Sequence, residues 1–252
     1  MIFYYIRHGD PVYTPDSLTP LGHEQAKALA KRLAVYGVDR VYASPSNRAM
    51  LTAQPTCDLL GLEMTTLDFA HEDLAGKYFS VSYDKGSRWC FYDPYYRDLF
   101  CSKEVRELGV HWYEHPALAR FREGFLYYYD RIDELFASLG YEHDRFSGRY
   151  KVTRTDDDRL ASFEHFGLTF HYRRERVALF AHQGFSMAFM SCALDIPYPH
   201  YAIHADICHT GLTAINFVEY DGWAIPRVMT MGNDSHRYRE GLPFLYNNEL
   251  EF

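Results

Sequence analysis

The sequence is poor in cysteine, in long apolar stretches and in positive charge, and each shortage excludes a class of protein. Its 252 residues include five cysteines, an odd number scattered along the chain, so we expect reduced thiols and no disulfide framework. No apolar run is long enough to span a bilayer. The net charge of -8 argues against a general nucleic-acid or anionic-membrane surface, although a local basic pocket is compatible with it.

The pattern of a secretory signal is also missing. The chain reaches Arg7 almost at once, without a basic region followed by a long apolar one, so we expect no signal peptide and a cytoplasmic protein. Its length suits a single domain, residues 1–252. Aromatic residues make up 17% of the chain, which suits either a deep aromatic-walled cleft or a bulky core, and composition does not separate the two.

Short apolar runs alternate with segments of helical spacing, which predicts an α/β fold. The run Val177–Ala181 is typical of a central strand covered on both faces. Other strands are predicted at residues 1–6, 39–43, 64–69, 212–220 and 223–231, the last two joined by an Asp-Gly hairpin turn. Helices are predicted at residues 20–36, 48–60, 117–139 and 185–194. Pro55 is expected to kink or break the second of these helices.

Two segments have weak patterns. Residues 10–17 form a predicted turn-rich loop, and residues 77–116 are dense in aromatic residues with poor periodicity. We interpret residues 77–176 as a helical or irregular cap with an extended insertion. Inside it, the acidic triplet Asp156-Asp157-Asp158 can bind a cation, but we favour a solvated hairpin tip.

Reactive side chains follow two of the predicted strands. Arg7, His8 and Gly9 come directly after the first strand, and His182 and Gln183 come after the run at 177–181. The carboxyl ends of parallel strands meet at the edge of a sheet where ligands bind, so we expect these side chains to converge. A glycine after the histidine allows a tight backbone turn.

The predicted cluster contains what phosphoryl transfer requires. Arg7, Arg48 and His182 offer donors for the non-bridging oxygens, and His8 offers a nucleophile. A carboxylate after the strand at 64–69, either Glu72 or Asp73, offers the acid for the leaving oxygen. The alternatives are ion-pairing surface arginines and a core histidine, but the strand-end and helix-start positions favour function. His71 and Gln183 are interpreted as pocket lining, and His200, His204 and His209 as loop residues without metal.

Five blocks, in this order and spacing, make the sequence resemble the histidine phosphatase superfamily, which includes cofactor-dependent phosphoglycerate mutases and many small phosphatases. The blocks are Arg7-His8-Gly9, Leu18-Thr19-Pro20-Leu21-Gly22-His23-Glu24-Gln25-Ala26, Ser44-Pro45-Ser46-Asn47-Arg48-Ala49-Met50-Leu51-Thr52-Ala53, Glu72 with Gly76, and Phe180-Ala181-His182-Gln183-Gly184. The resemblance is close over the first 76 residues and looser over residues 177–234.

The resemblance implies a three-layer sandwich of helices around a mostly parallel sheet, with a phosphate pocket at its edge. It implies that His8 becomes a phosphohistidine, which water then hydrolyses, and that Glu72 protonates the leaving alcohol. Arg7, Arg48 and His182 would hold the phosphate. The implied enzyme is a metal-independent phosphomonoesterase that needs no cofactor.

Two departures from the family pattern bear on the substrate. Thr14 stands where many relatives have asparagine, and its hydroxyl can still donate to phosphate. Residues 77–176 do not match the mutase pattern, which favours a phosphatase of a small phosphorylated metabolite over a phosphoglycerate mutase-type phosphotransferase. A non-catalytic module that binds a phosphorylated ligand or inorganic phosphate ranks last, because nucleophile and acid are both present. The sequence determines neither the substrate nor the oligomeric state.

Overall fold

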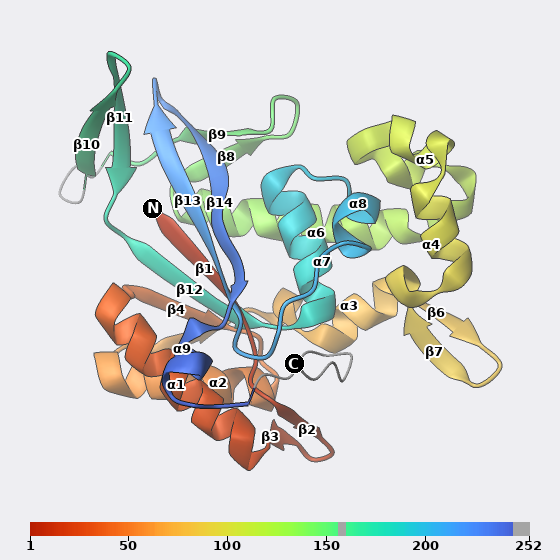
Figure 1. The fold of residues 1–252 in the computed structure, drawn as a ribbon. Helices are drawn as coiled ribbons and strands as arrows, with labels where there is room; N and C mark the ends of the chain where they lie inside the picture. Colours follow the sequence, from red (N-terminus) through yellow and green to blue (C-terminus); the bar gives the residue numbers. More distant parts are fainter. Residues whose placement is uncertain (156–159, 244–252) are drawn as a thin grey trace. The chain divides into compact units, whose positions relative to one another are not determined.

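The computed structural model describes residues 1–155 and 160–243, and the chain divides into two compact units (Figure 1). Unit 1 comprises Met1–His71, Thr155–His182 and Asp206–Phe252, and unit 2 comprises Glu72–Arg154 and Gln183–Ala205. The acidic triplet at residues 156–158 lies outside the described residues. The single-domain organisation expected from the sequence stays a prediction.

Unit 1 is built on a sheet whose strand order is β5-β4-β12-β1-β13-β14. Strands β1, β12, β4 and β5 are parallel neighbours, whereas β13 pairs antiparallel with β1 and β14. The elements of unit 1 are β1 (Ile2–Arg7), β2 (Pro11–Tyr13), β3 (Asp16–Leu18), α1 (Pro20–Tyr36), β4 (Arg40–Ala43), α2 (Asn47–Leu60), β5 (Met64–Thr66), the 3-10 helix Asp68–Ala70, β10 (Leu160–His165), β11 (Leu168–Arg173), β12 (Arg176–Ala181), β13 (Leu212–Tyr220), β14 (Trp223–Asn233) and α9 (Ser235–Arg239).

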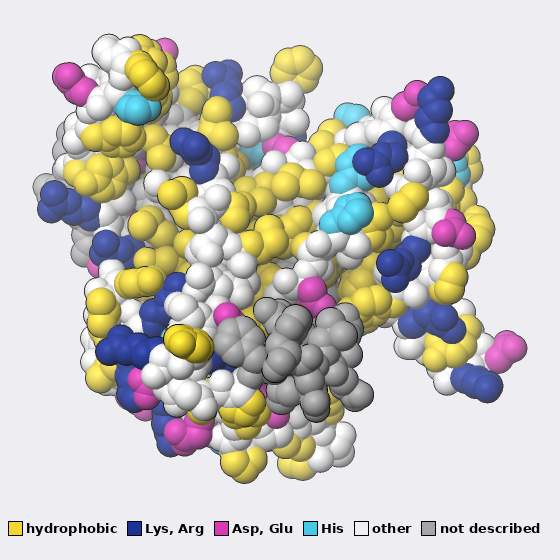
Figure 2. Space-filling view, in the orientation of Figure 1, with side chains coloured by type: hydrophobic (Ala, Val, Ile, Leu, Met, Phe, Trp, Pro, Cys, Tyr) yellow, Lys and Arg dark blue, Asp and Glu magenta, His cyan; other side chains and the backbone are white. Residues whose placement is uncertain are grey.

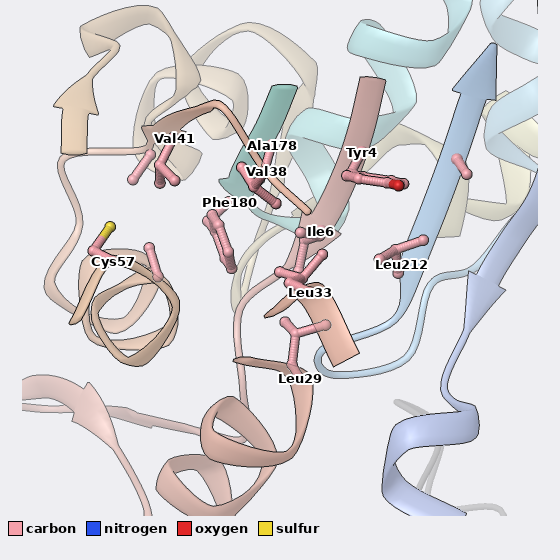
Figure 3. Close-up of a cluster of buried hydrophobic side chains, with 13 residues drawn as sticks. Tyr4, Ile6, Leu29, Leu33, Val38, Val41, Cys57, Ala178, Phe180 and Leu212 are labelled. Atoms are coloured by element: carbon pink, nitrogen blue, oxygen red, sulfur yellow. The ribbon is translucent and has the colours of Figure 1, made fainter. Parts of the chain in front are cut away.

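The central strands of unit 1 are buried along almost their whole length. In β1 and β12 every residue after the first is buried, as expected for strands covered on both faces. Leu29 and Leu33 of α1 and Cys57 of α2 belong to one apolar cluster with Ile6 of β1 and Phe180 of β12 (Figure 3). This packing holds the carboxyl ends of β1 and β12 in a fixed relation, so the residues that follow them start from neighbouring points.

Unit 2 is mainly helical and has an aromatic core. The Trp112 indole stacks on the Tyr198 ring at 5.3 Å and meets Phe125 edge-on at 5.2 Å. The elements of unit 2 are α3 (Glu72–Phe79), β6 (Ser80–Tyr83), β7 (Gly86–Trp89), the 3-10 helix Cys90–Tyr92, α4 (Pro94–Cys101), α5 (Lys103–Leu108), the 3-10 helices Gly109–Glu114 and Pro116–Phe121, α6 (Arg122–Ser138), β8 (Tyr141–Asp144), β9 (Arg149–Val152), α7 (Gln183–Leu194) and α8 (Tyr198–Ala202). The dense aromatic residues noted in the sequence therefore include a packed core.

Most element boundaries agree with the predictions, and the fold class is confirmed: α/β, with a central, mostly parallel sheet flanked by helices. Thr19 caps α1, Pro20 is its first residue, and Gly37 follows its last turn. Asp221 and Gly222 form the hairpin turn with φ of 51° and 75°, the left-handed region that an Asp-Gly pair tolerates.

The structure corrects or refines several local predictions. Of the kink or break predicted at Pro55, the break does not occur, because buried residues before and after it, including Ala53 and Cys57, hold both turns of α2 in place. Residues 10–17, predicted as a loop, contain most of the hairpin of β2 and β3. Residues 77–116, interpreted as helical or irregular, are mostly helical. The predicted helix at 117–139 begins as a 3-10 helix and becomes α-helical at Arg122.

Candidate active site

The loop after β1 packs directly against the start of α1. A Cβ on Gly9 would lie 2.8 Å from the carbonyl oxygen of Gly22, and a Cβ on Gly22 would lie 2.2 Å from that of Asp10. Both glycines are therefore required by the close approach of two backbones. The Gly9 amide also donates to Thr52 Oγ1 at 2.9 Å, which ties the loop to α2.

The block Leu18–Ala26 has a structural role in the same loop. Thr19 Oγ1 accepts the Gly22 amide at 3.0 Å as an N-cap and donates to Asp10 Oδ2 at 2.6 Å. Gln25 Oε1 accepts the Asp10 amide at 2.8 Å. These side chains hold the backbone on which the first histidine stands.

His8 is buried and its proton has a defined position. Its Nδ1 lies 2.7 Å from the Gly9 carbonyl oxygen, which can only accept, so Nδ1 carries the proton. Burial lowers the pKa of His8 well below its usual value, and the charge of Arg7 lowers it further. The neutral ring therefore presents an unprotonated Nε2.

Arg7 and Arg48 are both buried and are oriented by oxygen or nitrogen acceptors. Arg7 donates from Nη1 to the Ile207 carbonyl at 2.7 Å, and its Nη2 lies 2.9 Å from His209 Nε2. Arg48, in the first turn of α2, donates from Nη1 to Asp16 Oδ1 at 2.8 Å. A buried guanidinium retains its charge, so unit 1 holds two fixed cations near the ends of its strands.

The second predicted histidine lies close to the first. The rings of His8 and His182 are 5.2 Å apart, and His182 is fully buried. His182 Nε2 lies 2.7 Å from Ser44 Oγ and 3.2 Å from Ser46 Oγ, whereas its Nδ1 has no hydrogen-bond partner among the described residues. When a serine hydroxyl donates to Nε2, Nδ1 carries a proton that is available to a ligand.

His209 was interpreted from sequence as a loop residue, but it joins this cluster. Its ring lies 5.6 Å from that of His8, and its Nδ1 is 3.4 Å from Asp10 Oδ1. Thr210, the next residue, donates its amide to the Arg7 and His8 carbonyls. Its place just before β13 explains this, because a strand antiparallel to β1 begins at the edge where β1 ends. That place becomes a signal only once the pairing of β13 with β1 is known.

The structure does not bring every predicted residue into this cluster. Thr14 is exposed in the two-residue turn between β2 and β3, and its role stays a prediction. His71 lies in unit 1 with its ring 6.4 Å from that of His182. Gln183 is buried as the first residue of α7 in unit 2, where His200 also lies, in α8.

Glu72 is the first residue of α3, and its carboxylate caps α7. Oε1 accepts the Gly184 amide and Oε2 accepts the Phe185 amide, both at 2.9 Å. Two amide donors that a helix start leaves unsatisfied are thereby paired. Asp73 is exposed beside it. The sequence left Glu72 and Asp73 as alternatives for the acid. Of the two, Glu72 is the one that binds the backbone amides of residues shortly after His182 in the chain.

The described residues contain neither a metal-binding cluster nor a membrane-spanning helix. No group of three or more histidine, cysteine, aspartate or glutamate residues among them is arranged to hold a metal ion. None of the helices in this part of the chain is long and apolar enough to cross a membrane.

Three buried histidines and the partly buried His209 are expected to make unit 1 sensitive to acid. Burial is the largest cause that lowers the pKa of His8, His182, His209 and His236, and for the last two the pKa falls to about 3. An unfolded histidine binds a proton near pH ~6.5, so below that pH the unfolded chain takes up protons that the folded chain does not. We expect the free energy of unfolding to fall between about pH 7 and pH 5, by up to ~1.4 kcal/mol per pH unit for each histidine.

Urea unfolding at several pH values in this window measures the effect. The variant His236→Gln removes one of the four groups and should give a shallower dependence. A free energy of unfolding that stays constant over the window would contradict the prediction.

Comparisons with known proteins agree with the pattern of blocks. Residues 3–85 match the family model of the histidine phosphatase superfamily (branch 1). Over 84 residues the chain is 33% identical to a putative phosphoserine phosphatase 2 of Hydrogenobacter thermophilus. That match covers 30% of this chain and 41% of the relative, so it spans less than half of the relative's length. The predicted resemblance to the superfamily is confirmed.

Solved structures extend the likeness of the fold to almost the whole chain. A mycobacterial glucosyl-3-phosphoglycerate phosphatase in complex with inorganic phosphate superposes with a TM-score of 0.53 at 16% identity, covering 93% of this chain and 98% of that one. A phosphoserine phosphatase mutant from Entamoeba histolytica in complex with phosphoserine superposes with a TM-score of 0.54 at 14% identity and the same coverage. At these identities the likeness establishes the fold alone.

Proposed function

We propose that this chain is a metal-independent phosphomonoesterase that works through a phosphohistidine at His8. The observation that carries the proposal is the state of that ring: neutral, with Nδ1 bound to a carbonyl and Nε2 unprotonated, beside buried cationic and donor groups. A nucleophile for a phosphoryl group needs such a lone pair. The family match over residues 3–85 and the fold of the phosphatase neighbours support the proposal.

The binding step uses positive charge and hydrogen-bond donors. Arg7 and Arg48 would hold the non-bridging oxygens of the phosphate, with the Nδ1–H of His182 as a further donor. Because these groups are buried and already oriented, they need little rearrangement when charge develops in the transition state. Thr14 and Gly9 are proposed as a secondary phosphate donor and the turn that shapes the site, and Gln183 as lining.

The proposed reaction has two chemical steps. His8 Nε2 attacks phosphorus and forms an N–P bond while the bond from phosphorus to the leaving oxygen breaks. Glu72 gives its proton to that oxygen, so the product leaves as an alcohol. In the second step water attacks phosphorus, Glu72 takes a proton from the water, and the N–P bond breaks to release inorganic phosphate and free His8.

The substrate class is a small phosphorylated metabolite. The Hydrogenobacter thermophilus relative is described as a putative phosphoserine phosphatase, and one neighbour is a glucosyl-3-phosphoglycerate phosphatase, so alkyl phosphates of small organic acids are the first to test. On the face seen in Figure 2, Lys and Arg side chains are interspersed with Asp and Glu, which favours a small ligand over a nucleic acid. The experiment is a screen of phosphorylated metabolites with purified protein, read as phosphate release. Isomerisation with and without a bisphosphate primer, run alongside, would favour the mutase alternative if it exceeded hydrolysis.

Removal of metal ions is expected to leave the rate unchanged. The reason is that side-chain cations would fill the role that a metal plays in neutralising phosphate charge. Phosphate release before and after exhaustive chelation measures this, with vanadate or tungstate inhibition as evidence that the anion site is intact. A large loss that a divalent ion restores would refute a metal-independent reaction.

A further inference from the structure

The indole of Trp89 fills a space that Gly184 of unit 2 leaves open. Trp89 ends β7, and the hairpin of β6 and β7 lies beside α3 (Figure 1). A Cβ on Gly184 would lie 2.3 Å from both Cη2 and Cζ2 of the indole, and a Cβ on Gly76 would lie 3.9 Å from Cη2. The six-membered ring is therefore packed against the first turn of α7 and faces α3.

The carboxylate of Glu72 also lies beside the Cβ position of Gly184. Its Oε1 accepts the Gly184 amide, and it would lie 2.8 Å from a Cβ on that residue. The edge of the Trp89 indole, the Gly184 backbone and the Glu72 carboxylate thus meet in one small volume. A side chain larger than that of glycine at position 184 would leave no room for the indole and the carboxylate beside the backbone.

An indole edge changes the environment of a carboxyl group. Its carbon atoms displace water from the part of the carboxyl group that they cover, which disfavours the charged form, while the two amide donors favour the charged form. A carboxyl group under these opposing influences can change its protonation when a phosphate dianion arrives. Without the indole, more water would reach Glu72 and favour the charged form.

We propose that Trp89 is the positioning residue for Glu72: it holds the carboxyl group against the start of α7 and reduces the water around it, so that Glu72 is protonated when substrate is bound. This inference rests on the proposed role of Glu72 as general acid. Trp89 would act on the leaving group only through Glu72.

Packing within the hairpin of β6 and β7 and the residues after it keeps Trp89 in this position. Its ring stacks on the buried Phe91 at 5.5 Å with an interplanar angle of 20°. Arg88, the preceding residue, lies 4.0 Å from the centre of the Tyr83 ring and 3.8 Å from Asp93. Stacking on Phe91 therefore holds the indole beside Gly184, and the contacts of Arg88 stabilise the hairpin that carries it.

The test compares two leaving groups in the variant Trp89→Leu. We expect about a tenfold loss at neutral pH with the best alkyl phosphate of the metabolite screen, and much less with nitrophenyl phosphate, whose leaving group needs no proton. The alkaline limb of the kcat profile reports the pKa of the acid in the complex, and it should move to lower pH because water now stabilises the carboxylate.

Two variants make the result specific. Trp89→Phe keeps an aromatic ring and should restore most of the loss, and it replaces Trp89→Leu if the latter does not fold. Tyr92→Leu removes an exposed ring three residues along the same segment and should change neither the leaving-group ratio nor the alkaline limb. Equal losses on both substrates with an unmoved alkaline limb would overturn the proposal, because they indicate a structural role alone.

The variant Glu72→Gln separates failure of this inference from failure of the proposed function. If Glu72→Gln shows no dependence on the leaving group, the proposed acid is wrong and the inference fails with it. If Glu72→Gln shows the dependence and Trp89→Leu does not, only the inference fails. If both single variants show the dependence on the leaving group, the double variant is the last test. Trp89→Leu should then add no further leaving-group-dependent loss to that of Glu72→Gln.

Discussion

Replacement of His8 by alanine is expected to lower phosphate release by about 10⁴-fold or more, because the variant loses the only atom proposed to bond with phosphorus. Brief reaction with labelled substrate and an alkaline quench should trap an acid-labile phosphohistidine at His8 in the natural protein and none in the variant. Binding of tungstate should persist in the variant, since Arg7, Arg48 and His182 remain, and this shows that the loss is not due to unfolding.

His209→Ala is the matched control. Its ring is about as far from His8 as that of His182, but its Nε2 faces the guanidinium of Arg7. The variant should still form the phosphohistidine at His8. Full turnover by His8→Ala, or a label on another histidine, would remove the proposed nucleophile.

Glu72→Gln should slow hydrolysis of alkyl phosphates by about 10²–10⁴-fold, the usual contribution of general acid catalysis. An alkoxide is a poor leaving group and needs the proton, whereas nitrophenolate leaves without one. The glutamine amide can still accept one amide hydrogen bond at the start of α7, so the fold is expected to survive. The ratio of the rates on the two substrates, variant against natural protein, is the measurement.

Asp73→Asn is the neighbouring control. Its side chain is exposed in the first turn of α3, so the change should leave both rates almost unaltered. If Asp73→Asn shows the dependence on the leaving group and Glu72→Gln does not, the general acid is one residue further along the chain.

Much of the fold could be predicted because its signals are local. The apolar run that forms β12 needs no partner to be recognised, and Thr19 with Pro20 marks the start of α1 through backbone chemistry confined to a few residues. Pro55 shows the limit of local rules. Its effect on α2 depends on packing by residues on either side of it, and that packing keeps the helix unbroken.

The residues of the candidate site also fall into those that local signals predict and those that depend on packing. Arg7 ends β1, and His8 and His182 follow strands whose parallel pairing can be expected from sequence, so their convergence could be predicted. His209 precedes an antiparallel strand, and nothing in its own surroundings in the sequence reveals that β13 lies next to β1. Ser44 and Ser46 belong to one of the sequence blocks, but their contact with His182 spans more than a hundred positions and is not visible in the sequence.

The sequence by itself determined the order of strands and helices and the residue types available for phosphoryl transfer, because both depend on short stretches of chain. Only the tertiary structure decided which nitrogen of His8 carries the proton and which carboxylate caps α7. It also decided that the indole of Trp89 lies against Gly184. The reason is physical: the Glu72 carboxylate and the amides that bind it are 112 and 113 residues apart, and such contacts are set by the packing of the whole unit.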